Sequence, residues 1–239
     1  MKLSTNYDNP AERLSYRQLI SRNPIFSLPG GFLSLIDISV LIPIYNNDRY
    51  LRKCLDSVMN QTVRNIEVLM INDGSTDRSL EIMEEYSQQD ERFILINKPN
   101  TGYGHSLNVG FDKAKGRYIS IVESDDWILP TFLEDLLKVS TCNSINLDIV
   151  KSDYQTFKST NGTDVIQYRG SAVKNNNLYN KVITVKDPQL QKEIDVHSWN
   201  GIYRREFIQG NKIRHNETPG ASFQDTGFRW QYVCLNESI

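Results

Sequence analysis

Three acidic side chains fall within four residues of the stretch "YISIVESDDWILP", which runs from Tyr118 to Pro130. They are Glu123, Asp125 and Asp126, and they follow an apolar, β-branched run that is typical of a buried strand. Clustered carboxylates are costly there unless a cation or hydrogen-bond donors pair with them. Mg²⁺ and Mn²⁺ prefer carboxylate oxygens, and Mg²⁺ usually adds substrate phosphates. The cluster therefore predicts a metal and diphosphate site, and the alternative is that an Asp only caps the next helix.

The elements that must position these acids alternate between strand and helix from Ile38 onward. Apolar runs predict four strands, at residues 38–44, 66–72, 93–98 and 117–123. Helical patterns lie between and after them, over Arg49–Asn60 with Asp48 as its expected N-cap, over Leu80–Tyr86, from the Gly-rich loop to near Gly116, and over Thr131–Ser140. This alternation predicts a parallel α/β sheet, in which ligands bind beyond the carboxyl ends of the strands.

Polar clusters occupy those predicted strand ends, namely "PIYNN", "INDGSTD", "NKPNTGYGHS" and "ESDDW". Each of the first three could be only a turn, since Asp, Asn and Gly serve turns without any ligand. The Gly-rich cluster could also cradle a phosphate with backbone N–H groups. It is not a Walker loop, and Leu107 stands where GxGxxG needs its third Gly.

The second half has a different texture. The stretch "LDIVKSDYQTF" predicts a strand, "NGTDVIQYRG" predicts a hairpin, and a helix is expected from Asp225. The 239 residues carry a net charge of -2, so no global basic field for nucleic acid exists. Three well-separated cysteines without a CxxC pair argue against a disulfide framework.

No apolar run reaches the ~18 residues that would span a bilayer, and the first residues lack a signal-peptide core. The apolar patch Ile25–Ile36 is interrupted by Pro and Gly, which favours an arm packed on protein or on a membrane surface. The end "QYVCLNESI" has no structural terminator, so we expect that a C-terminal part is missing.

Four segments taken together closely resemble family 2 nucleotide-sugar glycosyltransferases of the GT-A fold, of the bacterial surface-glycan type. They are "ISVLIPIYN", "VLMINDGSTD", "NTGYGHSLNVGFDKAKGRYISIVESDDW" and "SFQDTGF". The resemblance is strong from Ile38 to Leu137 and patchier to Gly227. It implies an α/β fold with a Rossmann-like, mostly parallel sheet flanked by helices and a smaller mixed subregion on the acceptor side. The implied parts are an arm at 1–36, a nucleotide-sugar-binding half at 37–140, and an acceptor and catalytic-base half of the same domain at 141–239.

By this resemblance, ten residues would bind the nucleotide and donor: Pro43, Ile44, Tyr45, Asn46, Asp73, Gly102, Ser106, Glu123, Ser124 and Asp125. Asp125 matches the metal-binding acid of the family's DxD motif, and Glu123 and Asp126 are further candidate ligands for Mn²⁺ or Mg²⁺. Glu123 departs from the motif, which has Asp at that position. Asp225 matches the catalytic base of the family's "ED" pair, with Gln224 in place of Glu.

The implied activity is inverting transfer of a sugar, with UDP as the favoured nucleotide, to a glycan or lipid-linked acceptor in surface polysaccharide synthesis. The expected location is the cytoplasm, at or near the inner membrane face, with an oligomer allowed. The two departures keep open a catalytically impaired nucleotide-sugar or glycan-binding protein. A third alternative is a nucleotidyltransferase, which would need a Gly-rich basic loop after the first strand. The residues "PIYNND" at that place contain no glycine.

Several other residues have both a chemical and a structural interpretation. A lone histidine is more often structural than a metal ligand. Trp127 and Trp199 could each stack on a sugar ring or belong to the core. Arg204 and Arg205 could contact the diphosphate or the acceptor, although an arginine pair at a helix start is usually solvated. These candidates are His105, His197, His215, Trp127, Trp199, Arg204 and Arg205.

Overall fold

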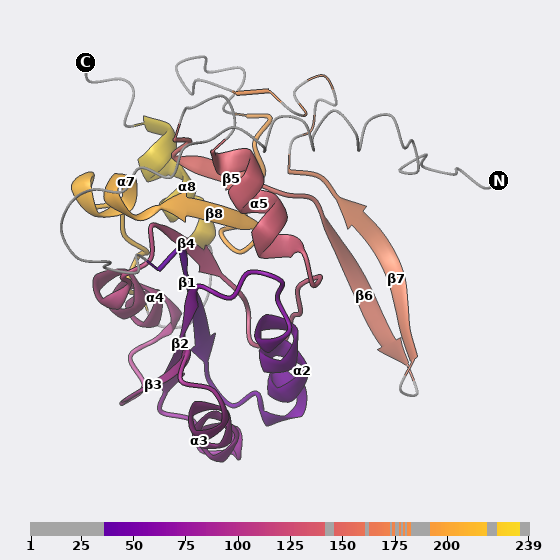
Figure 1. The fold of residues 1–239 in the computed structure, drawn as a ribbon, viewed down its shortest axis with the longest axis vertical. Helices are drawn as coiled ribbons and strands as arrows, with labels where there is room; N and C mark the ends of the chain where they lie inside the picture. The colour runs from indigo at the N-terminus through magenta and orange to yellow at the C-terminus, as the bar shows by residue number, and fades with distance from the viewer. Residues whose placement is uncertain are drawn as a thin grey trace. The chain divides into compact units, whose positions relative to one another are not determined.

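The computed structural model describes residues 36–141, 146–160, 163–172, 192–218 and 224–234, with residues 174, 177, 179, 181 and 182. Its main element is a six-stranded sheet in the order β3-β2-β1-β4-β8-β5 (Figure 1). Four parallel strands are β1 (Ile38–Ile44), β2 (Ile66–Asp73), β3 (Phe93–Lys98) and β4 (Tyr118–Ile121). β8 (Gly201–Arg204) pairs antiparallel with both β4 and β5 (Ile149–Lys151). The predicted mostly parallel α/β sheet is confirmed, and strands from both halves of the chain share it.

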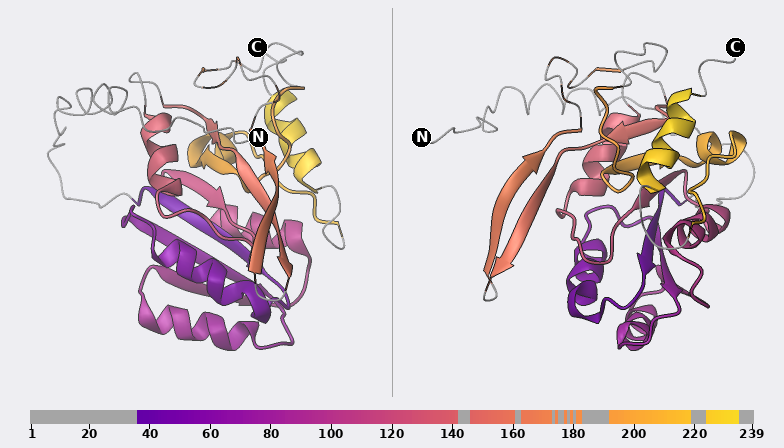
Figure 2. Two further views of the ribbon diagram at one scale, coloured as in Figure 1. Left: turned by 90° about the vertical axis from the view of Figure 1, so that its right-hand side faces the viewer. Right: turned by 180° about the vertical axis from the view of Figure 1, so that it is seen from behind.

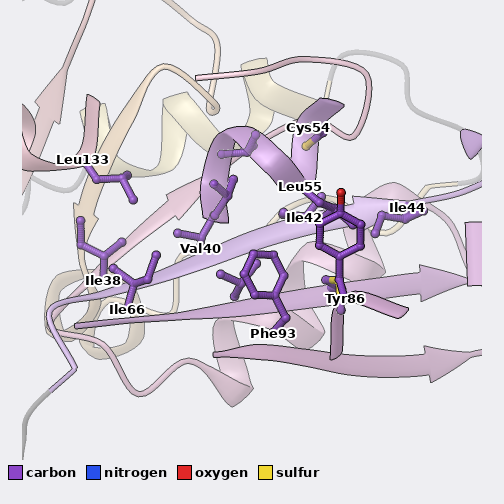
Figure 3. Packing of buried hydrophobic residues seen from close by; sticks show 14 of the residues in the cluster. Ile38, Val40, Ile42, Ile44, Cys54, Leu55, Ile66, Tyr86, Phe93 and Leu133 are labelled. Carbon is purple, nitrogen blue, oxygen red and sulfur yellow. The ribbon is translucent and has the colours of Figure 1, made fainter. Parts of the chain in front are cut away.

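Helices cover both faces of this sheet, as the views in Figure 2 also show. The first face packs on α2 (Asp48–Met59), α3 (Ser79–Gln89) and α5 (Phe132–Ser140). The second packs on α4 (Tyr103–Lys113), α7 (Arg205–Gly210) and α8 (Gln224–Cys234). The apolar run of β1 packs on both faces, because Val40 and Ile42 enter the first core (Figure 3). Leu41 enters the second core. None of the described helices is both long and apolar enough to cross a membrane.

Some expected boundaries were wrong. Helix α2 begins at Asp48, so the N-cap is Asn47, and its side chain makes no capping hydrogen bond. The Asp48 N–H instead donates to Asp77 Oδ2 at 2.9 Å. Strand β4 ends at Ile121, two residues early, because the chain turns there and Asp126 N–H bonds Glu123 O at 3.0 Å. The acids therefore lie on a loop beyond the strand.

The expected strand after Leu147 is two strands. Ser152 and Asp153 separate β5 from β6 (Tyr154–Thr160). The backbone N–H of Ser152 donates to Asn200 O at 2.8 Å, and Asp153 Oδ1 accepts from Ala172 N–H at 2.9 Å. These bonds redirect the chain into the predicted hairpin, in which β6 pairs with β7 (Thr163–Gly170) as a separate two-stranded sheet.

Candidate functional site

A cavity of about 280 Å³ opens at the carboxyl ends of the parallel strands. Its lining comes from the ends of β1 and β2, the Gly-rich loop, and the loop after β4, as parallel-sheet topology predicts. The lining residues are Pro43, Ile44, Tyr45, Asp73, Asn100, Gly102, Tyr103, Ser106, Glu123 and Ser124. Eight of them are predicted donor-binding residues, whose roles stay predictions. The other two, Asn100 and Tyr103, were not predicted from the sequence, although both lie within two residues of the predicted residue Gly102.

Two predicted donor-binding residues, Asn46 and Asp125, are not in the lining of this cavity. Asn46 adopts a positive φ of 49°, and its side-chain oxygen accepts a hydrogen bond from Thr76 N–H at 2.7 Å. It thereby fixes the "DGST" turn beside the cavity. The amide of the next residue, Asn47, donates to Ser124 Oγ at 2.8 Å and ties the first strand's loop to the acidic loop. Tyr45 is 52% exposed, so its ring is available to a flat partner such as a base.

Asp73 is the organising side chain of the Gly-rich loop. Its carboxylate accepts from the N–H groups of Thr101 at 2.8 Å and Gly102 at 2.9 Å, and it forms an ion pair with Lys98. Both charged side chains are nearly buried, with exposed fractions of 6% and 11%. The N–H groups of Thr101 and Gly102 therefore bind a protein carboxylate, and phosphate binding by the other N–H groups at the start of the helix stays a prediction. Gly102 has a φ of 96°, a backbone region that favours glycine.

The loop also packs directly on the chain that leads to α8. A Cβ built on Gly104 would lie 2.1 Å from the carbonyl oxygen of Asn216. The Asn108 amide donates to His215 O and to Glu217 Oε1, both at 2.9 Å. The predicted residue Ser106 is fully buried, and its hydroxyl donates to Gly102 O at 3.1 Å. These contacts fix the second half of the chain against the donor-side loop.

The acidic loop carries three carboxyl groups, and two of them have raised pKa values. Burial, with the charges of Asp225, Asp125 and Asp126, raises the pKa of Glu123 to about 8, although a hydrogen bond from Tyr103 opposes this. Burial and the Asp125 charge raise the pKa of Asp126 to about 6. Asp125 itself is exposed.

A divalent cation fits this loop, because its charge would offset the burial and the repulsion between acids that together raise both carboxyl pKa values. Among the described side chains, no three His, Cys, Asp or Glu residues form a ready-made metal cluster. Such a loop suits a cation that takes one or two protein carboxylates and completes its shell with substrate phosphates and water. Asp125, Glu123 and Asp126 remain the predicted ligands.

Asp225 lies in the first turn of α8, where the helix N-terminus favours a negative charge. Its Oδ1 accepts a hydrogen bond from the hydroxyl of Ser198, a fully buried residue just before β8. Its charge reaches across the site and raises the pKa values of Glu123 and Tyr103, after burial as the main cause. The neighbouring Gln224 is turned inward, and its amide donates to Thr218 O at 3.2 Å. The structure thus brings Asp225 close to the acidic loop.

The three histidines have structural contacts. His105 Nδ1 lies 2.8 Å from Thr101 Oγ1, within the Gly-rich segment. His197 Nδ1 lies 2.9 Å from Asp195 Oδ2. His215 is 2% exposed and stacks on Phe228 with ring centroids 4.4 Å apart, and burial lowers its pKa to about 3.

The tryptophans and arginines also have partners in the protein. Trp127 packs on Phe157 with centroids 4.0 Å apart, and Trp199 packs edge-on against Tyr154 at 4.8 Å. The arginines lie opposite the start of β4, since Arg204 pairs with Tyr118 in the sheet. Arg204 binds Asp148, and Arg205 Nε donates to Gly116 O at 2.8 Å. Both arginines therefore lie at the amino-terminal end of the parallel strands, opposite the end at which the cavity opens.

Comparison with known proteins gives a consistent result. A family model described as "Glycosyl transferase family 2" matches residues 39–211. The chain is 35% identical over 180 residues to "Putative glycosyltransferase EpsH" of Bacillus subtilis, covering 74% of this chain and 49% of that protein. It is 33% identical over 176 residues to "Glycosyltransferase GlyA" of Streptococcus pneumoniae, covering 72% of this chain and 25% of that protein. The chain thus spans half or less of these relatives.

Solved structures show the same fold. S. aureus TarS 1-349, crystallised in complex with UDP-GlcNAc, superimposes with a TM-score of 0.62 at 24% identity, covering 82% of this chain and 52% of that one. The mannosyltransferase PcManGT from Pyrobaculum calidifontis, in complex with GDP-Man and Mn²⁺, gives 0.56 at 14% identity, covering 95% and 59%. At these identities the likeness concerns the fold alone.

Proposed function

Because the chain belongs to glycosyl transferase family 2, we propose that it transfers a sugar from a nucleotide-diphosphate sugar to an acceptor hydroxyl with inversion. The observation that carries this proposal is the cavity at the strand ends, which has a metal-suited acidic loop on its rim and Asp225 beside that loop. UDP is the proposed nucleotide, and TarS complexes with UDP and UDP-GlcNAc support this choice. The proposed acceptor is a surface glycan or lipid-linked sugar, handled at the cytoplasmic membrane face, as the resemblance of the sequence motifs implies.

In the proposed reaction Asp225 is the general base. Its carboxylate takes the proton of the acceptor hydroxyl while that oxygen forms a bond to the anomeric carbon. The bond between the anomeric carbon and the phosphate oxygen breaks, and the nucleoside diphosphate leaves with the electron pair. The Ser198 hydroxyl orients this carboxylate before the reaction, at a helix N-terminus that favours negative charge.

On the donor side, the exposed ring of Tyr45 and the backbone at Pro43 and Ile44 would hold the base. Asp73 would act mainly by shaping the loop 98–102, on which Gly102 approaches the donor. Asp125, with Glu123 and Asp126, would hold Mn²⁺ or Mg²⁺, which neutralises the leaving diphosphate when bound.

The test is to incubate the 239-residue chain with Mn²⁺ and a panel of UDP- and GDP-sugars, with simple glycosides as acceptors. We expect release of nucleoside diphosphate that Asp225→Asn reduces at least 100-fold while calorimetry shows unchanged nucleotide affinity. Turnover that persists in Asp225→Asn would refute the base assignment. Nucleotide binding without turnover of any donor would instead support the impaired, sugar-nucleotide-binding alternative, which Glu123 and Gln224 keep open.

A further inference from the structure

Two hydroxyl groups lie between the acidic loop and the proposed base. Tyr103 Oη donates to Glu123 Oε1 at 2.5 Å, and Ser198 Oγ donates to Asp225 Oδ1. Each hydroxyl has one proton and donates it to one carboxylate, so each ties one carboxylate to the core of the fold. We call the four side chains Glu123, Tyr103, Ser198 and Asp225 the hydroxyl link. Its members come from the loop after β4, the start of α4, the segment before β8 and the start of α8.

Each hydroxyl is held by contacts that do not involve the two carboxylates. Tyr103 packs against the second core, and its ring meets His215 edge-on with centroids 5.9 Å apart. The carbonyl of Ser198 accepts from the Tyr203 hydroxyl at 2.9 Å, and Ser198 itself is fully buried. The hydroxyls are therefore fixed by the fold, and the carboxylates are oriented by binding to them.

The segment around Ser198 is itself braced. The Asn200 amide donates to Ser152 O and to Asp195 Oδ2, both at 3.0 Å. Lys151 donates to the carbonyl of His197. Burial lowers the pKa of this lysine to about 8, although Asp195 and Asp225 act in the opposite direction. These hydrogen bonds hold the backbone around Ser198 against the end of β5, so the Ser198 hydroxyl keeps a fixed position.

Each carboxylate depends on its own hydroxyl for this orientation. Removing the Tyr103 hydroxyl leaves Glu123 Oε1 without the hydrogen bond at 2.5 Å, and removing the Ser198 hydroxyl leaves Asp225 Oδ1 without its donor. Either carboxylate would then be able to rotate away.

We propose that Tyr103 and Ser198 are positioning residues, which hold the donor-side acid and the base at a fixed separation across the two halves of the fold. This inference rests on the proposed function, in which Asp225 is the base. A misplacement of about 1 Å can reduce a rate 100-fold, so the link should matter for turnover more than for binding. The resemblance to the family did not identify either residue.

The experiment compares Tyr103→Phe, Ser198→Ala, their double variant, and Ser198→Thr, which keeps the hydroxyl. Each is assayed as the full chain with Mn²⁺ and whichever sugar nucleotide the wild type consumes fastest. Matched controls are Tyr86→Phe and Ser140→Ala, which remove hydroxyls bonded to Asp56 and Leu137 outside the site. Circular dichroism melting checks that every variant is folded.

We expect each single variant to lower kcat at least tenfold, with KM for the donor and calorimetric affinity for UDP within threefold of wild type. Because each hydroxyl orients a different carboxylate, the losses of the two single variants should multiply in the double variant. Ser198→Thr should retain most of kcat, and both controls should match wild type. The cycle of Tyr103→Phe and Ser198→Ala decides the matter if the bulkier threonine does not fold.

Unchanged kcat in both single variants, or a double variant no worse than the poorer single variant, would overturn the hydroxyl link. A loss confined to KM would overturn it too, since that would make Tyr103 only a donor contact. These results leave the proposed function standing if Asp225→Asn is inactive. Absence of turnover in the wild type with every donor would overturn both proposals together.

Discussion

The substitution Asp73→Asn tests whether the carboxylate of Asp73 builds the donor-side loop. This side chain accepts three hydrogen bonds, from Lys98 Nζ and from the N–H groups of Thr101 and Gly102. Asparagine has nearly the same shape but offers one accepting oxygen, and its NH₂ group would face an N–H donor. The variant therefore removes charge and one acceptor while leaving the volume of the side chain unchanged.

The magnitude follows from the bonds that are lost. One backbone N–H loses its partner, which costs about 1–3 kcal/mol, and the bond from the Lys98 ammonium loses its charged acceptor, which costs about 1.5–3 kcal/mol. Both side chains of the pair are nearly buried, with 11% and 6% exposed, so solvent screens this pair weakly. We expect the free energy of unfolding to fall by roughly 3–5 kcal/mol, the usual cost of breaking a buried pair.

Urea unfolding followed by circular dichroism measures the stability, and calorimetry with UDP and Mn²⁺ measures binding. UDP affinity should fall at least tenfold, because the displaced loop carries Gly102 on the cavity wall. The matched control is Asp90→Asn, which breaks the ion pair to Arg92, 2.6 Å long and largely buried, at the start of β3. That control should lose stability but keep UDP affinity within twofold.

Adding Lys98→Met to Asp73→Asn should recover about 1–3 kcal/mol, since the lysine would no longer be buried without its charged partner. The reasoning is refuted if Asp73→Asn costs less than 1 kcal/mol. It is equally refuted if Asp73→Asn and Asp90→Asn weaken UDP binding to the same degree, because the effect would then reflect stability alone.

Three further outcomes are expected. Burial lowers the pKa of His215 to about 3, so below pH 6.5 the unfolded chain binds a proton at this residue while the native chain does not. Urea titrations should therefore show that His215 makes the free energy of unfolding about 2 kcal/mol lower at pH 5 than at pH 7. The variant His215→Leu should lose this part of the pH dependence of stability. Gly104→Ala should destabilise by roughly 1–3 kcal/mol in thermal melts, because its Cβ would meet Asn216 O at 2.1 Å, whereas Gly210→Ala, with nothing within 4 Å, should not; equal effects would contradict the packing. Asp125→Asn, at an exposed position, should change stability by less than ~0.5 kcal/mol yet abolish the Mn²⁺ dependence of UDP binding in calorimetry, and retained dependence would remove Asp125 from the ligand set.

Much of the fold was predictable from local pattern. Strand β1 is seven apolar or small residues, buried throughout, and no other element type suits such a run between polar turns. Parallel strands end at one edge, so the polar residues after β1, β2 and β4 had to meet there. The ends of the helices could not be predicted as closely, since by its residue type Asp48 could begin a helix or cap it. In the structure α2 begins at Asp48, whose N–H donates to Asp77.

What only the tertiary structure decided are the long-range pairings. The sequence by itself determined the alternation of strands and helices, the rim of polar residues around Tyr45, Asp73 and Glu123, and the acidic charge that calls for a cation. It could not show that the Asp73 carboxylate accepts from loop N–H groups, or that Tyr103 binds Glu123 and Ser198 binds Asp225. Periodicity reports which face of an element is buried, whereas these bonds depend on how segments 20 to 28 residues apart pack against each other.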